Sequence, residues 1–139
     1  MSKNKRRLNY SFTAAFAGFI FGFDTIVISG VDQKLQDLWH STDLFHGLVV
    51  IGMALWGTVI GAIFGGLPTN YFGRKKTLLW IGYLYSISAI GSAISSDPIT
   101  FAFFRFIGGI GIGISTIAAP AYISEISAPN ERGKFVGYY

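Results

Sequence analysis

Two charged residues, Asp24 and Arg105, stand inside long apolar stretches of the sequence. A charged side chain at the centre of a membrane span costs about 2.5 to 3.5 kcal/mol, so it usually meets a partner or lines an aqueous cavity. In spans of roughly 20 residues, Asp24 and Arg105 are each about seven residues from the same predicted membrane boundary. At about 1.5 Å per residue, both lie roughly 10 Å below it. The matching depth indicates that the two side chains can meet.

The pairing of Asp24 with Arg105 supports two interpretations, and both stay open at the level of the residues. A static ion pair would hold two helices together. A proton switch would bind Arg105 while Asp24 is ionised and release it when Asp24 is protonated. In general, burial raises the pKa of a carboxyl group and a neighbouring arginine lowers it, so a cavity that opens alternately to each side can change the balance.

A second group of charges, Arg74, Glu125 and Arg132, follows the ends of two apolar stretches. Glu125 is an acid among basic segments, so it can bridge Arg74 and Arg132 and tie the second span to the fourth. Such a tie would act either as a gate on this side of the membrane or as a simple staple between loops.

The remaining residues point away from catalysis and from metal binding. The chain has no cysteine, and His40 and His46 lack a third ligand at metal spacing, so we expect both histidines at a solvated or interfacial position. The glycine-rich run at 108–113 lies inside a span and lacks the strand and the lysine of a phosphate loop. No nucleophile stands beside a base. The sequence therefore predicts no enzyme, no cofactor and no metal.

The composition predicts a membrane protein made of helices. Hydrophobic residues make up 51% of the 139 residues and charged residues 13%, with a mean hydropathy of +0.49, unlike a soluble domain. We predict an all-α membrane protein with one unit, no soluble domain, four spans and the start of a fifth near residue 135. The four predicted spans cover about 8–31, 44–66, 77–95 and 99–124.

The distribution of basic residues predicts the orientation. All Lys and Arg residues except Lys34 and Arg105 fall on one side of the predicted spans, and short cytoplasmic loops carry such an excess. The N-terminus is therefore predicted to be cytoplasmic, in a multi-pass protein of the plasma (inner) membrane, and the positive charge does not indicate nucleic-acid binding. The first apolar run, about 24 residues, exceeds the roughly 7 to 15 of a signal peptide, so we read it as a retained span.

Small residues recur four apart in three of the spans, which predicts close helix packing. The first span has Ala14, Gly18 and Gly22. The second and fourth have Gly57, Gly61, Gly65, Gly109 and Gly113. A direct role for these glycines in ligand binding is the less favoured alternative.

Three segments resemble the sugar porters of the major facilitator superfamily. The stretch GFDTIVISG resembles the aromatic-Asp-Thr segment of the first span in that family. The connector GGLPTNYFGRKK resembles its G-x-x-x-(D/N)-x-x-G-R-(K/R) motif, and RFIGGIGIG followed by PAYISEISAPNERGK resembles its fourth-span pattern. The residues at the defining connector positions are Gly66, Asn70, Gly73, Arg74 and Lys75. Asn70 and Tyr71 occupy connector positions that the family often fills with Asp and a basic residue, so part of the family's charge network in the connector is changed here. Pro129 falls one residue later than in the family pattern, although Glu125 and Arg132 keep their spacing.

The resemblance implies a twelve-span transporter of two six-span halves that works by alternating access. It implies that Asp24 and Arg105 form the proton-coupling pair and that Phe21 lies near the sugar. It also implies a cytoplasmic gate in the charge network, with the residues Asn70, Gly73, Arg74, Glu125 and Arg132.

The sequence therefore predicts the N-terminal part of a proton-coupled monosaccharide symporter, with monosaccharide and proton as transported species and the lipid bilayer as surroundings. The remaining transporter helices are absent from this chain. Two alternatives are an uncoupled sugar facilitator and a non-transporting four-helix membrane interaction protein that oligomerises. Which sugar is carried is not predicted.

Overall fold

The computed structural model describes residues 3–127 and 129–137, without the side chains of residues 3–11, 13–15, 17 and 21. All regular elements in these residues are helices, in agreement with the predicted all-α fold. They are α1 (Lys3–Trp39), α2 (Asp43–Phe45), the π-helical turn η1 (His46–Ile51), α3 (Gly52–Phe64), α4 (Gly66–Phe72), α5 (Arg74–Ile94), α6 (Pro98–Ile126) and α7 (Arg132–Val136).

Three segments of the described chain are long and apolar enough to cross a membrane: Asp43–Phe64, Arg74–Ile94 and Pro98–Ile126. The second, third and fourth predicted spans fall on these segments. The first predicted span, 8–31, lies within α1. The predicted start of a fifth span falls at the end of α7, and residues 138–139 lie outside the described part of the chain.

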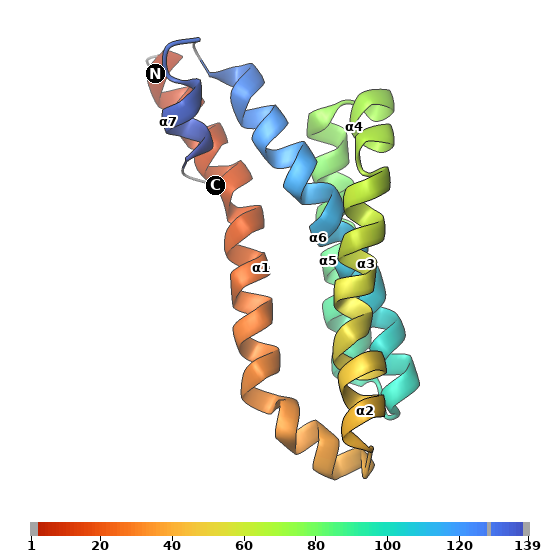
Figure 1. Ribbon diagram of the computed structural model, residues 1–139. Helices are drawn as coiled ribbons and strands as arrows, with labels where there is room; N and C mark the ends of the chain where they lie inside the picture. The colour runs from red at the N-terminus through yellow and green to blue at the C-terminus, as the bar shows by residue number, and fades with distance from the viewer. Residues whose placement is uncertain (1–2, 128, 138–139) are drawn as a thin grey trace.

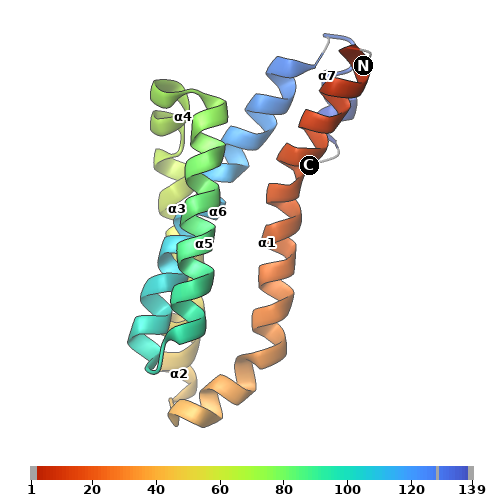
Figure 2. The ribbon, with the colours of Figure 1, turned by 180° about the vertical axis from the view of Figure 1, so that it is seen from behind.

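Helix α6 is the central element, with α3 and α5 packed against it (Figures 1 and 2). Glycines let α3 and α6 approach closely, as the spacing of small residues predicts. A Cβ added at Gly57 or Gly61 would meet the backbone of α6, and one added at Gly109 or Gly113 would meet the backbone of α3. This contact is therefore backbone against backbone, and it fixes the position of α6.

Helix α1 stands apart from this group along much of its length (Figures 1 and 2). None of its described side chains is fully buried, and a Cβ added at Gly22 would meet nothing within 4 Å. The close packing that the small residues of the first span predict is therefore not formed at Gly22. Helix α1 is therefore held to the other helices by a small number of contacts.

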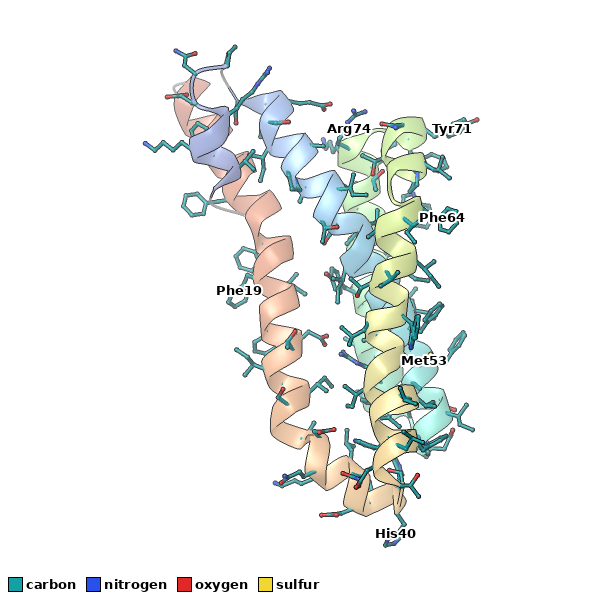
Figure 3. All side chains as sticks on the ribbon, viewed as in Figure 1. Phe19, His40, Met53, Phe64, Tyr71 and Arg74 are labelled. Carbon is teal, nitrogen blue, oxygen red and sulfur yellow. The ribbon has the colours of Figure 1, made fainter. Side chains whose placement is uncertain are left out.

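The polar segment after Val31 continues α1 as a helix to Trp39 instead of forming an irregular connector. Beyond its long straight part, α1 changes direction and runs toward α2 (Figure 1). Ser29 and Gly30 precede this segment, and Gly/Ser pairs are a common cause of helix kinks. We call this end of the bundle, where Figure 3 labels His40, the His40 end, and the opposite end, which holds both chain termini, the terminal end.

A sharp bend joins α4 to α5 at the terminal end. Gly73 has a φ of 83°, a conformation that glycine adopts without the steric cost of a Cβ. The hydroxyl of Thr77 donates to the carbonyl oxygens of Pro68 at 3.1 Å and Gly73 at 3.0 Å. These hydrogen bonds hold α4 against the first turn of α5, and so they position Arg74.

Candidate functional site

The Asp24 and Arg105 side chains are in contact, which joins α1 to α6. Nη1 of Arg105 donates to Oδ1 of Asp24 at 2.6 Å and to Oδ2 at 2.7 Å. The Arg105 side chain is 11% exposed and the Asp24 side chain 32%. Hydrogen bonds between ionised groups are short and roughly twice as strong as neutral ones. This contact is therefore a main attachment of α1, which has few others.

A cavity of about 460 Å³ adjoins this pair, between α1, α5 and α6. Most of its lining is apolar or small, and Asp24 and Arg105 are its charged members. Nε of Arg105 is buried and makes no hydrogen bond within the described residues. The guanidinium group thus has room beside it and an unused donor, so its position depends on the carboxylate it contacts.

Arg74 and Glu125 form a second ion pair, at the terminal end, between the start of α5 and the end of α6. Nε of Arg74 lies 2.8 Å from Oε1 of Glu125, although the two atoms lack the alignment of a hydrogen bond. The side chains are 33% and 52% exposed. Figure 3 shows Arg74 at this end of the bundle, beside the end of α6. The predicted tie between the second connector and the fourth span is therefore present in the structure.

The structure does not bring the other predicted gate residues to Glu125. Arg132 begins α7 and is exposed, and no ion pair joins it to Glu125, although both residues are described. The expected three-residue bridge is thus a two-residue pair. The chain turns back after α6, and Phe135 of α7 packs on Ile123 of α6. Asn70 is exposed on α4. Phe21 lies in α1, and its side chain is outside the described part of the structure.

A polar cluster at the His40 end was not expected from the sequence. His46, expected at a solvated or interfacial position, is 3% exposed. Its Nε2 lies 2.8 Å from Oδ1 of Asp32, and its Nδ1 lies 3.1 Å from the hydroxyl oxygen of Ser41. His40 is exposed, as expected. The signal that could have indicated the cluster is an acid near the end of one span and a histidine near the start of the next.

Trp39 makes a further contact of α1 near the same end. Its ring centroid lies 5.4 Å from that of Phe101 on α6, and its Nε1 donates to the carbonyl oxygen of Ser96 at 3.3 Å. Asp24, Asp32 and Trp39 thus attach α1 to the other helices at three successive heights.

Comparison with known proteins identifies the family. The family model described as "Sugar (and other) transporter" matches residues 10–139. The chain belongs to the sugar transporter family. Membership places it among the sugar porters of the major facilitator superfamily, as the three motifs predict. This is a family of integral membrane transporters and not of enzymes.

Individual members of the sugar transporter family are similar over most of the chain. A glucose transport protein of Synechocystis is 41% identical over 121 residues, which cover 87% of this chain and 26% of that protein. An arabinose-proton symporter of Bacillus subtilis is 38% identical over 129 residues, covering 93% of this chain and 28% of that protein. The chain thus spans little more than a quarter of the length of these two relatives.

Solved structures from the sugar transporter family share the fold. A structure of the proton:xylose symporter XylE bound to 6-bromo-6-deoxy-D-glucose superposes with a TM-score of 0.89 at 28% identity. The match covers 99% of this chain and 34% of that one. A partially occluded inward-open structure of XylE from E. coli gives a TM-score of 0.86 at 30% identity. The helices described above therefore form part of a major facilitator fold.

Proposed function

We propose that this chain is the N-terminal part of a proton-coupled monosaccharide symporter of the plasma (inner) membrane, with its N-terminus in the cytoplasm. The observation that carries the proposal is the contact between Asp24 and Arg105. Three relatives of similar sequence are named as arabinose-proton symporters and one as a D-xylose-proton symporter, which supports coupling to protons.

In the proposed mechanism, the charge of Asp24 decides whether α1 is attached to α6 at this height. While Asp24 is ionised, both of its oxygens accept hydrogen bonds from Arg105. A proton on Asp24 removes the negative charge and leaves one carboxyl oxygen as a donor, so the bidentate contact with a cation is lost. The adjacent cavity then gives Arg105 space to move, and α1 has few other contacts that would hold it.

The partial exposure of Asp24 suits this role. At 32% exposure, its side chain is covered less by the described helices than the Arg105 side chain, which is 11% exposed. In the proposed mechanism, the carboxylate of Asp24 takes up the mobile proton, and the guanidinium of Arg105 is its counter-charge while Asp24 is ionised. We propose monosaccharide and proton as the transported species, with Phe21 near the sugar. In the same mechanism, the Arg74–Glu125 pair closes the cytoplasmic side. Asn70, Gly73 and Arg132 are the other residues that we propose for this gate.

The test replaces Asp24 by asparagine, which keeps the size of the side chain and removes its charge. Residues 1–139 replace the matching segment of the E. coli D-xylose-proton symporter, and sugar uptake is measured in proteoliposomes with an imposed proton gradient. We expect D24N to abolish accumulation against a gradient while sugar exchange between the two sides continues. D97N, which changes a carboxylate outside the cavity, should leave accumulation intact.

Accumulation by D24N as strong as that of the parent would contradict coupling through Asp24. Uptake by the parent that a protonophore does not reduce would instead support an uncoupled facilitator. A second measurement does not require transport by the chimaera. In the 139-residue chain in lipid nanodiscs, spin labels on α1 and α6 should report a wider distance in D24N than in the parent chain.

A further inference from the structure

The His46 cluster joins two helices at the His40 end and takes no part in the proposed coupling. Asp32 comes from α1, Ser41 from the connector after it, and His46 from the first position of η1. The His46 side chain is 4% exposed, whereas that of Asp32 is 41% exposed. A covered imidazole therefore has a carboxylate beside it that water can reach.

The hydrogen-bond partners determine which ring nitrogen of neutral His46 carries the hydrogen. An ionised carboxylate only accepts hydrogen bonds, so Nε2 of His46 must be the donor to Asp32. Nδ1 is then the acceptor, and the hydroxyl of Ser41 is its donor. Both nitrogens of the neutral ring are satisfied in this arrangement.

The same arrangement accepts a proton without the loss of a contact. A proton taken from water binds Nδ1, which becomes a donor to the Ser41 oxygen, because a hydroxyl group can accept as well as donate. Nε2 continues to donate to Asp32, and the ring now carries a positive charge next to the carboxylate. Protonation thus converts a hydrogen bond between α1 and η1 into an ion pair, which is stronger.

The other charged groups at this end do not compete for His46. Lys34 and Asp37 lie on α1, His40 in the connector, Asp43 on α2, and Asp97 at the start of α6. Asp43 accepts a hydrogen bond from Gln36, and Asp97 accepts hydrogen bonds from Thr100. Within the described residues, Asp32 is the carboxylate that contacts His46.

We propose that His46 is a second proton-binding site of this chain, and that its protonation clamps α1 to the start of the second span. Histidine is the side chain whose charge changes between about pH 5 and pH 8, so the clamp would respond to the medium at the end that we predict to face outward. Asp32 follows Asp24 by eight residues, or about 12 Å of helix. The clamp therefore limits how far α1 can move at Asp24.

The two proton sites act on α1 in opposite directions, which allows a clean test. Protonation of Asp24 releases α1 from α6, whereas protonation of His46 tightens α1 on η1. The measurement is therefore made in the D24N background, where the first effect is absent whether or not Asp24 couples transport. The chain has no cysteine, so I26C and L55C place one spin label each on exposed positions of α1 and α3.

The distance between the two labels is measured in lipid nanodiscs at about pH 5 and about pH 8, on either side of the histidine range. We expect a single narrow distance in acid, and a shift of about fivefold toward a longer, broader population at the higher pH. H46Q keeps a donor and an acceptor but cannot be protonated, so its distances should not depend on pH. D32N should also lose the response, because the charged ring then has no counter-ion.

The matched control is H40Q, which removes the other histidine of the chain, an exposed one, and should keep the full response. A response that survives in H46Q, or is lost in H40Q, would overturn the proposal. NMR of the two histidine rings, labelled with ¹⁵N, gives a readout that needs no variant. A His46 ring that keeps a single hydrogen down to about pH 5 would likewise contradict it.

Discussion

Asp97 occupies the turn between α5 and α6, where its carboxylate caps the first turn of α6. The backbone N–H of Thr100 donates to Oδ2 at 2.9 Å, and the Thr100 hydroxyl donates to Oδ1 at 2.8 Å. These hydrogen bonds hold the pKa of Asp97 below its ordinary value of 3.8. The backbone hydrogen bond from Thr100 has the larger effect, and the one from the Thr100 side chain comes second. The ionised cap thus satisfies one of the free N–H groups at the start of the helix.

The lowered pKa of Asp97 makes the cap sensitive to strong acid. The pKa of Asp97 is lower in the folded chain than in the unfolded chain. The ionised carboxylate therefore stabilises the fold at any pH above its pKa in the unfolded chain. This stabilisation is lost as the pH falls through its pKa in the folded chain. We expect the NMR shift of the Thr100 amide to stay constant down to about pH 4 and to change on further acidification. D97N keeps an acceptor oxygen that does not titrate, so its shift should stay constant. An equal change in D97N would refute the assignment.

At the scale of residues, the sequence predicts contacts that follow from the depth of a residue in the membrane. It misses contacts that follow from the path a helix takes beyond its span. The contact between Asp24 and Arg105 follows from two independently placed spans, because a buried charge needs a partner near its own height. The burial of His46 could not be predicted in this way. It depends on α1 continuing as a helix beyond Val31, which carries Asp32 against η1.

At the scale of elements, the sequence predicts the close contact between α3 and α6 from the spacing of their glycines. Backbone atoms of Ala54 lie where a Cβ of Gly109 would be, and backbone atoms of Ile110 lie where a Cβ of Gly61 would be. Neither helix can shift sideways without steric overlap or a gap, so α6 holds Arg105 at a fixed place. Rigid placement matters because α1 has to find the guanidinium group through a small number of contacts.

We expect G109A to destabilise the bundle by about 1 to 3 kcal/mol, because the added methyl group overlaps the backbone of α3. The matched control is G82A in α5, where a Cβ would meet nothing within 4 Å. G82A should be neutral or stabilise by up to about 1 kcal/mol, since alanine favours helix more than glycine does. Reversible unfolding in mixed detergent micelles gives both values. Equal stabilities for the two variants would mean that the α3–α6 contact is looser than described.

The position of a helix along the chain can be predicted where apolar composition determines it. It is harder to predict where packing against another helix determines it. Apolar length places the segments Asp43–Phe64, Arg74–Ile94 and Pro98–Ile126 to within a few residues of the predicted spans. The π-helical turn η1 carries no sequence signature that we recognise. The open surroundings of Gly22 show that small residues four apart permit close packing without enforcing it, because a partner helix must also be present.

In the molecule as a whole, polar contacts between helices lie at both ends of the bundle. At the terminal end, the Arg74–Glu125 pair joins α5 to the last turn of α6, which leans away from α5 toward α1 (Figure 1). Pro120 lies inside α6 and removes one backbone hydrogen bond there. The end of α6 is thus a segment whose position a single ion pair can bias.

We expect E125Q to let the ends of α5 and α6 separate more often, because the glutamine has no charge to offer Arg74. A partly exposed ion pair contributes about 1 kcal/mol or less, so the populations should change by no more than about fivefold. Distances between spin labels at the two helix ends, measured in nanodiscs, test this. K75Q removes a neighbouring exposed charge and should have no effect. An unchanged distance distribution in E125Q would remove the gate proposal.

The separation of 81 residues between Asp24 and Arg105 has a consequence for biosynthesis. Ribosomes add about 5 to 20 residues per second, so about 4 to 16 s pass between the addition of Asp24 and the addition of Arg105. During this interval Asp24 has no counter-charge, and an isolated carboxylate in a span is costly. The nascent first helix must therefore be held by the insertion machinery or lie near the membrane surface. Once Arg105 has been synthesised, it can pair with Asp24, and the final position of the first helix becomes favourable.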